Sequence, residues 1–65
     1  MNNIILGLQI LQRQGTRDVQ PIIAADGVIT VYLNSSVENF FVVNNLTNLG
    51  WSAYNNGKNW FYVID

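Results

Sequence analysis

Residues 51–62 have the sequence WSAYNNGKNWFY, in which an Asn56-Gly57 pair is flanked by aromatic residues on both sides. Asn-Gly is favoured in two-residue hairpin turns because both turn positions adopt a positive φ angle. Counting outward from the turn places Ala53 opposite Trp60. The segment therefore predicts a β-hairpin with one face formed by Trp51, Ala53, Trp60, Tyr62 and Ile64, and the other formed by Tyr54, Phe61 and Val63.

A second hairpin is predicted around Asp26-Gly27, where a turn of the same type separates two apolar, β-branched segments. In this register Ala25 lies opposite Val28. Pro21 fits an edge position or the first residue of a strand, because it has no N–H to donate to a neighbour. The pattern predicts a core face of Ile22, Ala24, Ile29, Val31 and Leu33, and an opposite face of Ile23, Thr30 and Tyr32.

An apolar segment at residues 4–11 precedes the first hairpin. Ile4, Leu8 and Leu11 have the i, i+4, i+7 spacing of the inward face of a helix. Asn2 or Asn3 can cap the first turn of that helix. A strand is the alternative, because apolar residues also alternate in this segment, but the helix is favoured.

A second apolar segment, residues 37–49, precedes the last hairpin. Ser35 stands three residues before Glu38, which is the spacing of a capping box and predicts that a helix begins here. Gly50 supplies the left-handed residue that commonly ends a helix. The alternative is a strand at the β-prone residues 40–43, followed by a short helix from residue 44. The inward arc of the favoured helix contains Phe40, Val42, Val43, Leu46 and Leu49.

Three apolar side chains have no place on these inward faces. Leu6 and Ile10 project from the back of the first predicted helix, and Phe41 falls among asparagines on the polar side of the second. Exposed aliphatic and aromatic side chains of this kind are typical of contact surfaces. We therefore expect another chain to cover them.

The order helix, strand, turn, strand occurs twice, once over residues 2–33 and again over residues 35–65. We predict a single α+β domain over residues 1–65, made of two αββ units. Their hairpins are expected to form one four-stranded, mainly antiparallel sheet with both helices on one face.

The composition predicts an association with a partner. A chain of 65 residues buries only about 60% of the surface that its unfolded form exposes. It has no cysteine for a disulfide and no histidine for a soft-metal site, and 49% of its residues are apolar while 11% are charged. The remaining way to cover apolar surface is a second copy of the chain or another protein.

The chemistry that the chain lacks excludes most enzyme classes. Without histidine or cysteine there is no imidazole base and no thiolate nucleophile, and no segment has the alternating oxygen ligands of a calcium loop. We predict no catalytic residue, no cofactor and no metal. The net charge of −1 argues against nucleic acid as a partner.

No apolar run reaches the roughly 20 residues of a membrane span and no signal-peptide pattern is present, so a cytoplasmic location is expected.

The chain has the segment Gly7-Leu8-Gln9-Ile10-Leu11, preceded by Ile4. It also has the segment 46–51, of the form LxxLGW, and Trp60 in the last hairpin. In these features the chain resembles a loose group of small proteins encoded by phages and mobile elements. The resemblance covers nearly the whole chain and implies an accessory protein acting in the host cytoplasm. Proteins of that setting commonly occlude a surface of a host protein, as the inhibitors of bacterial defence systems do, anti-CRISPR proteins among them.

The sequence therefore predicts a small non-catalytic protein-binding module, homodimeric or docked on a partner. Two other functions are open: a single-stranded nucleic-acid binder that uses an aromatic sheet face, and a small structural subunit of an assembly. Neither the partner nor the biological process follows from the residues. The side chains predicted to form the protein interface are Leu6, Ile10, Phe41, Tyr54 and Trp60.

Overall fold

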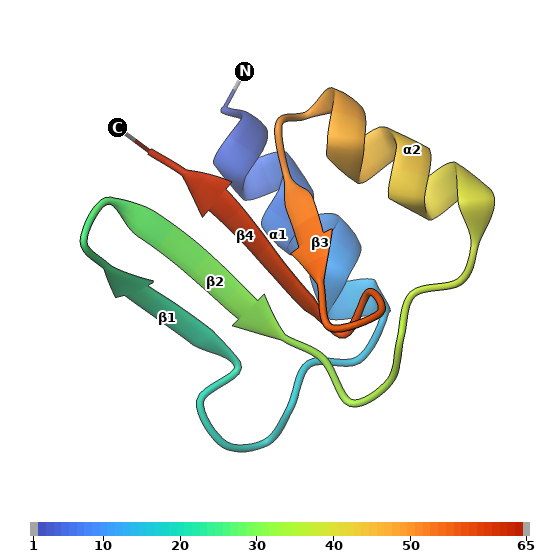
Figure 1. Cartoon of the computed structure of the whole chain (residues 1–65), viewed down its shortest axis with the longest axis horizontal. Helices are drawn as coiled ribbons and strands as arrows, with labels where there is room; N and C mark the ends of the chain where they lie inside the picture. Colours follow the sequence, from blue (N-terminus) through green and yellow to red (C-terminus); the bar gives the residue numbers. More distant parts are fainter. Residues whose placement is uncertain (1, 65) are drawn as a thin grey trace.

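The computed structural model describes residues 2–64, so Met1 and Asp65, the end residues of the predicted domain, lie outside the described residues. It has the α+β class that the sequence predicts, and its strands form a single antiparallel sheet of order β1-β2-β4-β3 (Figure 1). The elements are α1 (Asn3–Arg13), β1 (Ile22–Ala25), β2 (Val28–Tyr32), α2 (Phe40–Asn48), β3 (Ser52–Tyr54) and β4 (Asn59–Val63).

Turn chemistry sets the register of both hairpins. Asp26 and Gly27 have φ angles of 55° and 77°, and Asn56 and Gly57 have φ angles of 58° and 82°. These positive angles match the twist of the flanking strands. The two predicted registers are confirmed, with Ala25 opposite Val28 in one hairpin and Ala53 opposite Trp60 in the other. Pairing of β2 with β4 joins the hairpins into one sheet.

Helix α1 forms where the apolar spacing predicts a helix, and the strand alternative is wrong. The side chain of Asn2 accepts a hydrogen bond from the Ile4 backbone N–H at 2.8 Å, which satisfies one free donor of the first turn. Leu11 is fully buried, while Ile4 and Leu8 pack against the core. The inward face is therefore the predicted one.

Helix α2 begins later than predicted. The capping box of Ser35 and Glu38 is wrong, because Asn39 is the N-cap and accepts from the Phe41 N–H at 2.9 Å. The chain before it stays extended since Val37 is buried in the core and donates its N–H to the Gly57 carbonyl at 3.1 Å. Residues 40–43 are helical, so a strand at this tetrad is excluded.

The end of α2 is the predicted one. Gly50 has a φ of 101°, and its N–H donates to the Thr47 carbonyl at 3.0 Å. The Trp51 N–H donates to the Leu46 carbonyl at 2.9 Å. These two bonds form a Schellman motif, which usually includes a hydrophobic contact between the two residues joined by the longer bond, here Leu46 and Trp51. Leu46 and Trp51 are both buried, so the motif also delivers Trp51 to the core.

The core combines residues of both helices with one face of the sheet. Each buried indole also donates a hydrogen bond, from Trp51 Nε1 to the Asn3 carbonyl at 3.2 Å and from Trp60 Nε1 to the Gly57 carbonyl at 3.0 Å. Each of the two largest core side chains therefore has a hydrogen-bond partner for its indole N–H. The buried members are Leu11, Val31, Leu33, Val37, Leu46, Trp51 and Trp60.

Three residues predicted for the core are exposed. In Figure 1, α1 passes behind β4 and β3 while α2 lies beyond β3, so no helix of the described chain reaches the outer strand β1. Ile22 is consequently 42% exposed, and Ala24 is exposed as well. Phe40, predicted for the inward arc of the second helix, is 69% exposed because it is the first residue of α2, next to the cap. The equivalence of two αββ units and the placement of both helices on one face stay predictions.

Neither helix of the described residues has the length and apolar composition that crossing a membrane requires.

Candidate functional site

The sheet has a face that points away from the core. Side chains alternate along a strand, so residues next to the buried Val31 and Trp60 project from the opposite side. Figure 1 looks onto this side, with α1 behind the sheet. We call it the open face and define it by the cross-strand neighbours Ile23, Ala25, Val28, Thr30, Tyr32, Ser52, Tyr54, Asn59, Phe61 and Val63.

Aromatic contacts organise the open face. The rings of Tyr54 and Phe61 lie 5.7 Å apart at a tilt of 56°, a favourable geometry for an aromatic pair. The guanidinium carbon of Arg17 lies 5.6 Å from the centre of the Tyr32 ring, within the range of a cation–π contact. The neighbouring Tyr54 side chain is the largest cause that raises the pKa of Tyr32, through hydrogen bonding, and this electrostatic link joins the outer strand β3 to the Tyr32–Arg17 pair.

This link predicts an alkaline titration. The pKa of Tyr32 in the folded chain lies above its ordinary value of 10.0, so the stabilisation from this contact is present below pH 10.0 and is lost as the pH rises through the folded-state pKa. Ultraviolet absorbance should show one tyrosine that ionises later than an ordinary one. In Tyr54→Phe the pKa of Tyr32 should return toward its ordinary value. Unchanged titration in that variant would contradict the link.

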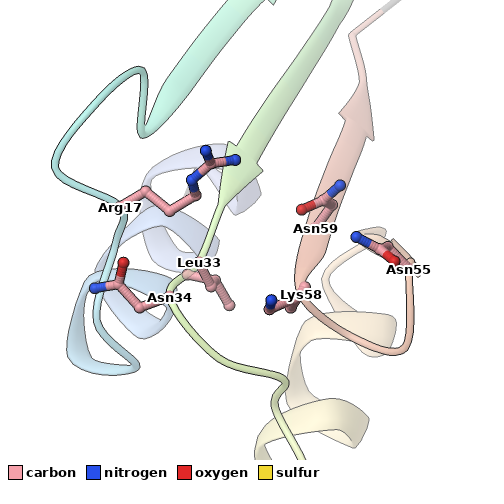
Figure 2. Close-up of a pocket in the computed structure, with 6 residues that line it drawn as sticks. All are labelled: Arg17, Leu33, Asn34, Asn55, Lys58 and Asn59. Carbon is pink, nitrogen blue, oxygen red and sulfur yellow. The ribbon is translucent and has the colours of Figure 1, made fainter.

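A polar pocket of about 310 Å³ lies at one end of the sheet (Figure 2). Three stretches of chain that are distant in sequence form it: the segment before β1, the residues just after β2, and the turn between β3 and β4. Two of the chain's three basic side chains, Arg17 and Lys58, line it, and no lining residue is acidic. The other lining residues are Leu33, Asn34, Asn55 and Asn59.

Backbone hydrogen bonds fix the walls of this pocket. The Arg17 N–H donates to the Tyr32 carbonyl at 3.0 Å, and the Leu33 N–H donates to the Lys58 carbonyl at 2.9 Å. Asn34 is held twice, since its N–H donates to the Gly15 carbonyl at 3.1 Å and its side-chain amide to the Thr16 carbonyl at 3.0 Å. The pocket is therefore formed in advance of any ligand. Sequence reasoning missed it because no local pattern brings Arg17 to Lys58.

The five predicted interface residues do not form one surface in the structure. Phe41 is 76% exposed on α2, and Tyr54 is 44% exposed on the open face. Leu6 and Ile10 are half-buried, and Ile10 packs against the core instead of standing free at the back of α1. Trp60 is 1% exposed, so the expectation that it is available to a partner is wrong. Its side chain belongs to the core cluster that also contains Leu11 and Leu46.

The structure shows an exposed aromatic pair that the predicted interface contains only in part. Phe40 and Phe41, the first two residues of α2, have their ring centres 6.0 Å apart in an edge-to-face arrangement. Both side chains are more than two-thirds exposed. The sequence identified Phe41 but assigned Phe40 to the core, because the predicted start of the helix was too early.

Within residues 2–64 no three His, Cys, Asp or Glu side chains gather as a metal site would require. No family model, curated protein or solved structure matches this chain.

Proposed function

We propose that this chain is a small non-catalytic module that binds another protein through the Phe40–Phe41 pair. The observation that carries the proposal is the exposure of two adjacent phenylalanines, at 69% and 76%. Full burial of one such side chain is favourable by roughly 1.5–3 kcal/mol. Aromatic side chains contribute much of the binding energy at the centre of protein interfaces, and here two of them are adjacent and solvent-exposed.

The surroundings of the pair suit a contact surface. The Asn39 side chain accepts from the N–H groups of Phe41 and Val42, at 2.9 Å and 3.4 Å, so the first turn of α2 is rigid. A rigid anchor loses little conformational freedom when it binds. No charge lies in this turn, and a partner can therefore cover it without desolvating an ion.

We also propose a biological context for the chain and an internal repeat in its fold. The resemblance to small phage and mobile-element proteins supports an accessory protein that blocks a surface of a host protein in the host cytoplasm. The strand order β1-β2-β4-β3, with the second strand of each hairpin at the centre, supports two αββ units that share one sheet. The common core of both helices supports their placement on one face of it.

The test is capture of a partner by the full chain and by two matched variants. Phe41→Ser removes an exposed aromatic ring from α2, and Val19→Ser removes an apolar side chain that is 71% exposed elsewhere. We expect the wild type and Val19→Ser to retain one partner, and Phe41→Ser to bind it at least about tenfold more weakly. Equal retention by both variants, each still folded by circular dichroism, would contradict the proposed surface.

A second function is favoured by the Arg17–Tyr32 contact on the open face. Tyr32, Tyr54 and Phe61 offer rings on which the bases of a single strand could stack, and Arg17 offers a cation beside them. Affinity for an oligothymidine that falls steeply with salt would support this function. Absence of binding at low salt would exclude it.

A further inference from the structure

We propose that the pocket between Arg17 and Lys58 is a binding site for a phosphate group on a small molecule. The site is separate from the Phe40–Phe41 pair, and its residues serve no part of the proposed protein contact. The argument rests on charge, on donor geometry and on the rigidity of the walls.

The placement of charge is the first step. The chain has four acidic and three basic residues, and two of the three basic ones line this pocket. None of the six lining residues is acidic. In a protein of net charge −1, convergence of two cations without a carboxylate between them produces a local positive potential. A hollow with such a potential attracts an anion.

The donors surround the hollow from different elements. Figure 2 shows Arg17 and Asn34 on one side of the pocket, and Asn55, Lys58 and Asn59 on the other. Arginine offers a planar set of N–H donors, lysine a point charge, and Asn55 and Asn59 side-chain amides that can donate. The Asn34 amide instead donates to the Thr16 carbonyl at 3.0 Å and serves as part of the wall. Donors on opposite walls suit a tetrahedral anion with oxygens in several directions better than a flat carboxylate with two.

The rigidity of the pocket is the third step. The Arg17 side chain is held against the Tyr32 ring, and the Lys58 backbone is tied to Leu33 at 2.9 Å and to Asn55 at 3.2 Å. Arg17 and Lys58 line the same pocket, so a doubly charged anion bound there can neutralise both positive charges. A phosphate monoester carries close to two negative charges at neutral pH. The volume of about 310 Å³ leaves space for a small group attached to the phosphate.

The experiment is a titration of the full chain with inorganic phosphate at low salt, followed by the backbone and side-chain amide signals in NMR. We expect saturable binding with the largest shifts at residues 17, 34 and 55–59. Arg17→Gln and Lys58→Gln should each weaken the affinity by about tenfold or more, as loss of a charged hydrogen bond does. Both side chains are exposed, so neither variant should disturb the fold.

Arg13→Gln is the matched control, because it removes the third basic side chain from α1, outside the pocket. Affinity within about twofold of the wild type is expected for this variant, because Arg13 does not line the pocket and so donates no hydrogen bond to a phosphate held there. Equal weakening by all three variants would show a general charge effect and overturn the site. Acetate that binds as tightly as phosphate would overturn the ligand class, and absence of saturable binding would overturn both.

A small phosphorylated ligand and a single strand of nucleic acid are distinguished by two further arms. A sugar monophosphate should bind at least as tightly as inorganic phosphate, because its phosphate fills the same donors. The alternative result is that an oligonucleotide binds while inorganic phosphate and the sugar monophosphate do not, and that Tyr54→Ala loses the oligonucleotide. This result would show that the pocket serves nucleic-acid binding on the open face, and it would overturn the small-molecule site.

Discussion

Gly7→Ala should destabilise the domain by about 3 kcal/mol, although the same change in the middle of an ordinary helix stabilises it by about 1 kcal/mol. Gly7 is buried in α1 against Trp51. A methyl group at this position would fall on the indole ring, with Nε1, Cε2 and Cδ1 as its nearest neighbours. The ring cannot move aside freely because it is 1% exposed and Nε1 donates to the Asn3 carbonyl at 3.2 Å.

The size of this effect is large for so short a chain. Stability of roughly 0.05–0.15 kcal/mol per residue gives a 65-residue domain about 3–10 kcal/mol in total. Overpacking typically costs about 1–3 kcal/mol, and displacement of the ring also breaks a hydrogen bond worth about 1 kcal/mol. Gly7→Ala should therefore remove roughly a third or more of the total stability, measurable as a lower urea midpoint.

Two controls separate crowding from other effects of the substitution. Gly15→Ala adds the same methyl group where no atom lies within 4 Å, at a φ of 87°, and should cost only about 1–2 kcal/mol of backbone strain. In a Trp51→Leu background, Gly7→Ala should cost less than in the wild type, because the smaller side chain leaves room. Equal costs in both backgrounds would show that the indole does not cause the effect.

Local chemistry made the hairpins predictable. Asp26-Gly27 and Asn56-Gly57 specify two-residue turns, and the turn fixes the register of the two strands that it joins. Gly50 ended α2 for a similar reason, since a left-handed residue was needed directly after the helix. In each case the decisive residues lie within a few positions of the feature that they determine.

Features that depend on contacts between distant segments were not predictable. Ser35 and Asn39 are both acceptable helix caps, and the burial of Val37 beside Gly57 selects the second. The hairpin pattern separated the two faces of β4 but did not show which face the helices would cover, so Trp60 was assigned to a surface. The Arg17–Lys58 pocket needs three segments at once.

Trp60→Ala should unfold the domain, and this expectation changes how a partner surface can be mapped. Trp60 is 1% exposed, lies between Val31 and Ala53 in the sheet, and donates Nε1 to the Gly57 carbonyl at 3.0 Å. Removal of a buried tryptophan side chain costs about 3–5 kcal/mol, which approaches the whole stability of a domain of this size. The variant should lose its cooperative urea transition and the near-ultraviolet circular dichroism of the wild type.

Loss of partner capture by Trp60→Ala would therefore report unfolding and not a lost contact. Trp60→Phe is the informative companion, because it keeps an aromatic ring in the core but gives up the hydrogen bond to Gly57; it should fold with a stability between those of the wild type and Trp60→Ala. If Trp60→Phe folds and still captures the partner that Phe41→Ser loses, the core and the contact surface are separate. A cooperative transition in Trp60→Ala within about 1 kcal/mol of the wild type would contradict the central place of this indole in the core.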